Sequence, residues 1–145
     1  QDWKAVGKDY AQMMVKTSQA LAQNLQDRGV NIYAANRGFT KSHQFAILAA
    51  PYGGGQTAAK RMGEAGLLAC GIGLPITPVE GDLNGLRIGT PEIVRIGMKV
   101  EHMDQLAKFI ADSLDTSSNK ESIKREVTEW RRQFSGVHYT VDTPN

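Results

Sequence analysis

Cysteine is almost missing from this 145-residue chain, which contains only Cys70. A single thiol excludes an intramolecular disulfide and fits a reducing compartment, so we expect a cytoplasmic protein. Long apolar runs and a signal-like leader are also missing, and we therefore predict no membrane partner. The net charge is only +2, and the basic residues are scattered along the chain. Without a basic stripe, the sequence argues against a nucleic-acid partner.

Clusters of metal ligands are absent as well. The three histidines, His43, His102 and His138, lie far apart in the sequence and have no Cys, Asp or Glu at ligand spacing. We therefore predict no metal site. Because no partner base is evident for Cys70, we interpret it as a small core residue rather than as a nucleophile.

The length is that of one domain, and the apolar spacing predicts its elements. Apolar residues recur every three or four positions from Val6 to Leu25, which predicts one helix over residues 2–28 that ends at Gly29. The pattern further predicts strands at 30–34, 43–49, 67–72 and around 87, helices at 56–62, 100–114 and 123–134, and a loop at 73–84. We expect an α+β domain in which a long N-terminal helix and further helices are layered on a small, largely antiparallel sheet.

A glycine-rich loop, Gly53-Gly54-Gly55, precedes the predicted helix at 56–62. Such a loop can hold a phosphate through backbone N–H groups, or it can simply be a flexible turn. Its spacing is neither that of a P-loop nor that of a dinucleotide fingerprint, which favours the turn.

One permanent charge interrupts the apolar segment Gly85-Leu86-Arg87-Ile88-Gly89-Thr90-Pro91. In a strand, Leu86 and Ile88 would face one side of the sheet and Arg87 the other. The guanidinium matches a carboxylate with two parallel hydrogen bonds, so Arg87 is a candidate anchor for an amino acid or keto acid. The alternative is an arginine on an edge strand that is simply exposed to water.

The segment from Gly85 to Gly97 resembles the signature near the C-terminus of serine hydroxymethyltransferases. Thr40-Lys41-Ser42-His43 and the following strand also look like that family's Thr-Asp-Asn-His strand, from which Lys41 and Ser42 depart. The resemblance implies that residues 1–145 are the C-terminal small domain of a fold-type-I pyridoxal-phosphate enzyme. It gives Arg87 the role of binding the substrate carboxylate. It also places His43 near the active-site side, where it either binds substrate or forms structural hydrogen bonds.

The same resemblance implies that pyridoxal phosphate is bound outside this chain. In that family the Schiff-base lysine and the groups that hold the cofactor lie in a large domain, and no Thr-Thr-Thr-His-Lys-like segment is present here. We expect no catalytic residue in this chain, no activity of the chain alone, and a homodimer in the full-length enzyme, with the large domain of the same polypeptide as a partner. The start at Gln1 is interpreted as a cut N-terminus, with the large domain before it.

The stretch Cys70-Gly71-Ile72-Gly73-Leu74-Pro75 departs from the Asn-Lys-Asn-Ser-Val-Pro-like stretch that helps those enzymes receive folate. Because the amide and amine donors are missing, the use of tetrahydrofolate is doubtful. A folate-independent relative would keep Arg87 and act on α-methylserine or transfer an aldehyde between threonine-type amino acids. A second class of function also remains open, a non-catalytic module that binds an amino acid for regulation.

Overall fold

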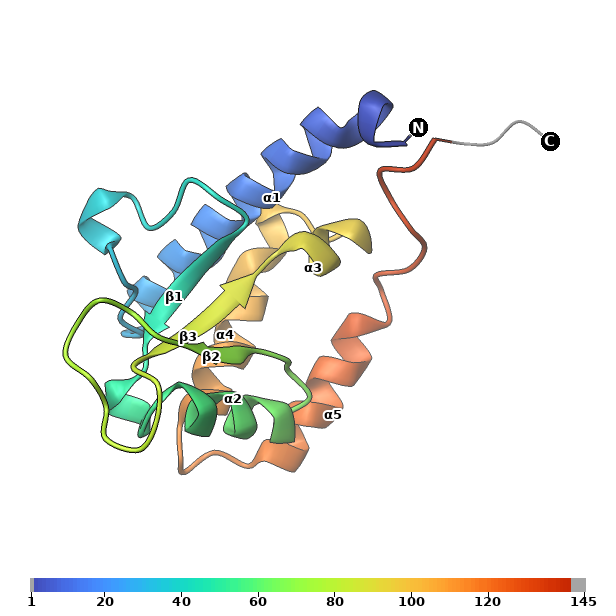
Figure 1. Cartoon of the computed structure of the whole chain (residues 1–145). Helices are drawn as coiled ribbons and strands as arrows, with labels where there is room; N and C mark the ends of the chain where they lie inside the picture. Colours follow the sequence, from blue (N-terminus) through green and yellow to red (C-terminus); the bar gives the residue numbers. More distant parts are fainter. Residues whose placement is uncertain (1, 142–145) are drawn as a thin grey trace.

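The computed structural model describes residues 2–141 as helices layered on one small sheet (Figure 1). The predicted α+β class is confirmed. Gln1, on which the interpretation of a cut N-terminus rests, lies outside the described residues. The elements follow in the order α1 (Asp2–Asp27), η1 (Ala35–Arg37), β1 (Gln44–Leu48), η2 (Ala50–Tyr52), α2 (Gly55–Glu64), β2 (Cys70–Ile72), β3 (Gly85–Gly89), α3 (Pro91–Arg95), η3 (Val100–His102), α4 (Met103–Leu114) and α5 (Lys120–Arg131).

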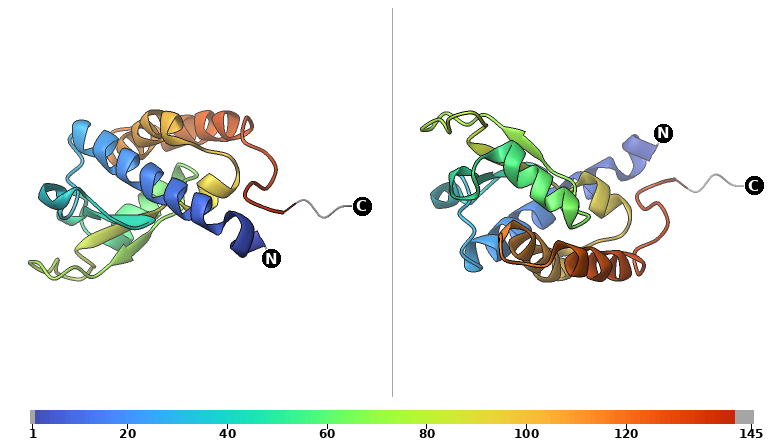
Figure 2. Two further views of the ribbon diagram at one scale, coloured as in Figure 1. Left: turned by 90° about the horizontal axis from the view of Figure 1, so that it is seen from above. Right: turned by 90° about the horizontal axis from the view of Figure 1, so that it is seen from below.

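The sheet has the order β1-β3-β2, and both strand pairs are antiparallel. The central strand, β3, is therefore the last of the three in the sequence. The views from above and below show that the helices gather on one side of the sheet (Figure 2). The sheet consequently has a covered face and an open face.

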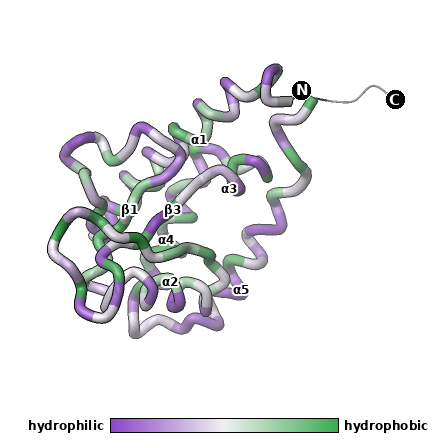
Figure 3. The backbone as a smooth tube through the Cα atoms, viewed as in Figure 1, coloured by the Kyte–Doolittle hydropathy of each residue, from purple (hydrophilic) through white to green (hydrophobic). Residues whose placement is uncertain are grey.

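The core lies on the covered face of the sheet. Phe45, Ile47, Leu86 and Ile88 point into it and are buried against apolar side chains of α1, α2 and α4. Along α1 and α5, hydrophobic and hydrophilic segments alternate, as amphipathic helices require (Figure 3). None of the helices in residues 2–141 has the length and apolarity needed to cross a membrane.

Two predicted strands differ from the structure. Residues 30–34 form only an isolated bridge between Ile32 and Ile47, because Ala34 adopts a left-handed conformation (φ 57°) and leads into η1. The strand predicted at 67–72 is limited to Cys70–Ile72. The short helix α3 was not predicted. It begins at Pro91, whose fixed φ suits the first helical position.

The helix α2 packs closely against two strands through glycine. A Cβ atom added to Gly55 would lie 2.0 Å from the carbonyl oxygen of Gly85 and 2.9 Å from the Cα of Gly71. Both atoms belong to the backbone, so the strands would have to move. We expect Gly55→Ala to lower the free energy of unfolding by roughly 2 kcal/mol or more in urea denaturation, because overpacking of this kind costs about 1–3 kcal/mol.

Gly63, in the same helix, provides the matched control. Apart from its chain neighbours and the nearby backbone of α2 itself, no heavy atom lies within 4 Å of a Cβ added there. Alanine is favoured over glycine in a helix interior by about 1 kcal/mol, so Gly63→Ala should stabilise the protein. Equal effects of the two substitutions would contradict the close approach of α2 to the sheet.

Candidate functional site

Arg87 lies at the middle of β3 and is exposed on the open face of the sheet. The predicted alternation is confirmed, because Leu86 and Ile88 are buried on the covered face. Arg87 is exposed, as in the alternative interpretation, but β3 is the central strand and not an edge strand. Arg87 pairs with Ala46 of β1 and with Cys70 of β2. An arginine on a central strand has its backbone held from both sides, which fixes where the guanidinium stem begins.

The nearest strand neighbours of Arg87 on this face are small, and the larger Gln44, Leu48 and Ile72 lie diagonally from it. Ala46 and Cys70 lie directly across, and Gly85 and Gly89 precede and follow Arg87 by two residues on the same face. Their side chains are too short to cover the guanidinium. The arrangement leaves room for a carboxylate to approach the planar side of Arg87.

Thr90 fixes the end of β3. Its side chain is fully buried, and its hydroxyl donates hydrogen bonds to the carbonyl oxygens of Met14 in α1 (2.8 Å) and His43 (3.2 Å). Its backbone N–H also donates to the carbonyl of His43, at 2.9 Å. The Thr-Pro part of the segment thus joins β3 to α1 and to the start of β1.

His43 lies just before β1, with an exposed side chain. Its contribution to the described hydrogen bonds is its backbone carbonyl, which accepts from Thr90. The sheet register pairs Arg87 with Ala46, three residues further along, and so does not align His43 with Arg87. A substrate-binding role of His43 stays a prediction.

Cys70 is half-buried on the open face opposite Arg87. The prediction that it is a core residue is therefore wrong. The pairing of the strands explains the difference. Residues paired across neighbouring strands lie on the same face of the sheet, and Arg87, the partner of Cys70, faces away from the core. Residues 2–141 contain no group of three or more His, Cys, Asp or Glu side chains that could hold a metal ion.

The buried amide of Asn84 folds the first part of the loop 73–84 over the open face. The side chain of Asn84 accepts a hydrogen bond from the Leu74 N–H (2.7 Å) and donates to the carbonyl oxygens of Leu74, Ile76 and Thr77. Leu74 lies over Gly85, where an added Cβ would be only 2.8 Å from its side chain. The loop therefore forms an apolar wall two residues from Arg87.

The glycine-rich loop before α2 does not hold a free anion site. Asp82 already occupies the N-terminus of α2, where its carboxylate accepts hydrogen bonds from the N–H groups of Gln56 (2.8 Å) and Thr57 (3.0 Å) and from the Thr57 hydroxyl (2.7 Å). These bonds hold the pKa of Asp82 far below its usual value. A phosphate would meet this negative charge, so the structure favours a structural turn over phosphate binding.

The fold defines an α+β domain that presents one arginine, with small residues directly across from it, on the open face of the sheet. No family model matches the chain. An alpha-methylserine aldolase from Ralstonia sp is 53% identical over 95% of the chain, and one from Variovorax paradoxus is 54% identical over 97%. A serine hydroxymethyltransferase from Sulfolobus acidocaldarius is 38% identical over 96% of the chain.

The chain spans about one third of the length of these curated relatives, with 32%, 31% and 33% of each covered. Among solved structures, an L-threonine transaldolase from Pseudomonas fluorescens in its internal aldimine state has the same fold. The TM-score is 0.82 and the sequence identity 23%, over 97% of this chain and 32% of that one. The predicted relationship is confirmed: this chain is a homologue, over nearly its whole length, of part of the serine hydroxymethyltransferases.

The Asp82 cap generates a prediction about pH. A folded-state pKa below the ordinary value of about 3.9 means that the unfolded chain binds the proton more strongly. The charged cap therefore stabilises the protein above about pH 4 and loses this effect as the pH falls toward the folded-state pKa. We expect Asp82→Asn to lower the thermal unfolding midpoint near neutral pH, with a smaller difference in acid.

Thermal unfolding of both proteins across a pH series measures this difference. The substitution keeps the size of the side chain and removes its charge. A difference between the two unfolding midpoints that becomes smaller as the pH falls is therefore due to the carboxylate itself. A difference in unfolding midpoint that stays constant down to the lowest pH at which both proteins fold would contradict the role of the Asp82 charge.

Proposed function

We propose that this chain is the C-terminal small domain of a longer serine hydroxymethyltransferase-like enzyme and supplies the arginine that binds the substrate carboxylate. The longer polypeptide is called the parent enzyme below. The observation that carries the proposal is the position of Arg87, the one charged strand residue on the open sheet face. The coverage of one third of the relatives supports a domain of a longer enzyme over a free-standing regulatory module.

Arg87 would bind the amino acid through two parallel hydrogen bonds from the guanidinium to the carboxylate. Hydrogen bonds that involve charged groups contribute about 1.5–3 kcal/mol each. The central strand fixes the base of the side chain, and the exposed Arg87 has only the small Ala46 and Cys70 directly across from it. The role of this chain is thus to hold and orient the substrate while the chemistry takes place on groups outside it.

The described residues of this chain do not fit pyridoxal phosphate. Lysines other than Lys120 are exposed, and Lys120 donates hydrogen bonds to Ser118 and Asp115. The one glycine-rich helix start is capped by Asp82. We therefore propose that the large domain of the parent enzyme binds this cofactor. We further propose that the parent enzyme is a homodimer.

Within this class, we propose an aldolase of the α-methylserine type that does not need folate. The aldolase relatives are 52–54% identical to the chain, whereas the hydroxymethyltransferase relatives are 34–38% identical. The wall beside Arg87 supports this choice, because Leu74 is apolar and the Asn84 amide is turned inward to the loop backbone. Neither side chain offers a polar group to a pterin or glutamate moiety.

Arg87→Ala in the parent enzyme tests the proposed carboxylate site. Loss of the charged hydrogen bonds should weaken amino-acid binding at least about tenfold, and Arg87→Lys should restore only part of the affinity because lysine lacks the planar fork. Binding is measured by calorimetric titration, with Arg125→Ala on the exposed side of α5 as the matched control. Unchanged substrate affinity and turnover, or loss of folding, would refute the assignment.

The proposed independence from folate has its own test. Because the segment 70–75 lacks amide and amine side-chain donors, the parent enzyme should bind tetrahydrofolate weakly or not at all, and adding tetrahydrofolate should leave the rate of α-methylserine cleavage unchanged. Calorimetric titration with a serine hydroxymethyltransferase as the positive control measures this. Tight binding to the parent enzyme would reject the folate-independent assignment and leave the Arg87 proposal standing.

A further inference from the structure

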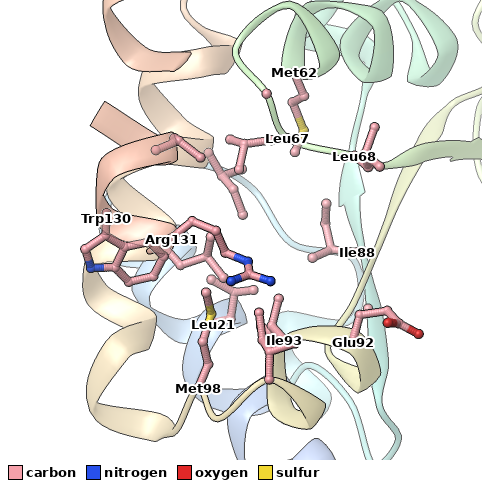
Figure 4. A pocket seen from close by; sticks show the side chains of 16 residues that line it. Leu21, Met62, Leu67, Leu68, Ile88, Glu92, Ile93, Met98, Trp130 and Arg131 are labelled. Atoms are coloured by element: carbon pink, nitrogen blue, oxygen red, sulfur yellow. The ribbon is translucent and has the colours of Figure 1, made fainter. Parts of the chain in front are cut away.

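A cavity of about 460 Å³ opens beside the sheet, on the side of β3 away from β1. Its walls come from several elements and are mainly apolar (Figure 4); they include Leu21, Met62, Ile88, Ile93, Met98 and Trp130. Ile88 points to the covered face, so the cavity is separate from the Arg87 side of β3. The proposed substrate site makes no use of it.

The cavity exists because β2 is too short to accompany β3 to its end. The last pair of the ladder joins Cys70 to Arg87, and beyond it Ile88 and Gly89 have no partner on this side. The N–H of Thr90 donates to β1, so the alternation of the strand directs the backbone groups of Gly89 the other way, toward the missing neighbour. A free strand end of this kind can pair with another extended segment.

The rim of the cavity is also apolar where it is most exposed. Leu68 is 96% exposed, more than any other large hydrophobic side chain among those described. Of the two charged residues at the cavity, Arg131 donates to the Phe134 carbonyl oxygen (2.5 Å), and Glu92 points away from the centre in Figure 4. Apart from the Arg131 guanidinium, which reaches among them in Figure 4, the side chains at the centre of the cavity are apolar, and the cavity fits apolar side chains.

We propose that an extended apolar segment of the same parent polypeptide, outside these 145 residues, occupies this cavity. It would insert one or two large apolar side chains, cover Leu68 and pair with the backbone of Gly89. This inference rests on the proposed function, because it needs the parent enzyme. Two thirds of the length of the relatives lie outside the matched region, which supplies ample chain for such a segment. A second copy of the domain and a small apolar molecule are the alternatives.

Photo-cross-linking in the parent enzyme tests this occupant. The photoreactive residue p-benzoylphenylalanine is introduced by Leu68→Bpa and, as a matched control, by Lys60→Bpa on the exposed side of α2. We expect Leu68→Bpa to form an intramolecular cross-link to a peptide outside the domain, with the product migrating as a single chain. The control should form no such cross-link.

Three outcomes overturn the proposal: a cross-link to a second chain, a cross-link within the domain alone, or no protein cross-link at Leu68.

Hydrogen exchange on the unsubstituted parent enzyme is a second measurement that needs no folding of a variant. The amides of Leu68 and Gly89 should exchange at least about tenfold more slowly than that of the exposed Gly81 in the loop. Equal exchange would overturn the proposal. Neither readout depends on substrate binding by Arg87, so the two proposals fail separately.

Discussion

The hydrogen bonds of Thr90 hold together the parts on which the open face depends. One fully buried hydroxyl reaches the middle of α1 and the residue before β1, while the backbone N–H of the same residue continues the ladder between β1 and β3. A buried hydroxyl without partners would be costly, so this position favours one arrangement of helix and strand over its alternatives. The place of Arg87 in space follows from it, because Arg87 lies three residues earlier on the same strand.

Much of this arrangement could be predicted from the sequence, because the spacing of the apolar residues and the positions of glycine and proline indicate it. The helix α1 ends at Asp27, close to the end that Gly29 indicated. The side of β3 on which Arg87 lies follows from its alternation with the buried Leu86 and Ile88. The Gly85–Gly97 segment also pointed to the serine hydroxymethyltransferases, to which the chain is similar over nearly its whole length. The role of Arg87 itself, in contrast, is a proposal that neither the fold nor the relatives decide.

The missed features depend on contacts between distant residues. Nothing local in Gly53-Gly54-Gly55 reveals that Asp82, some thirty residues later, caps the helix that follows. Cys70 was also predicted to lie in the core, because it follows a run of apolar residues in which no alternation is visible. Only its pairing with Arg87 shows that it lies on the open face. The cavity beside Ile88 arises from the difference in length between β2 and β3, which no single segment encodes.

The central position of β3 has a consequence for how the domain forms. Both β1 and β2 precede β3 in the sequence, and each pairs with it rather than with the other. During synthesis, therefore, two apolar strands leave the ribosome before their common partner exists. Until Gly85–Gly89 emerges, both have unpaired edges, the state in which partly folded chains associate wrongly. The strand that presents Arg87 is also the one that completes the sheet, so the arginine reaches its position only when the sheet closes.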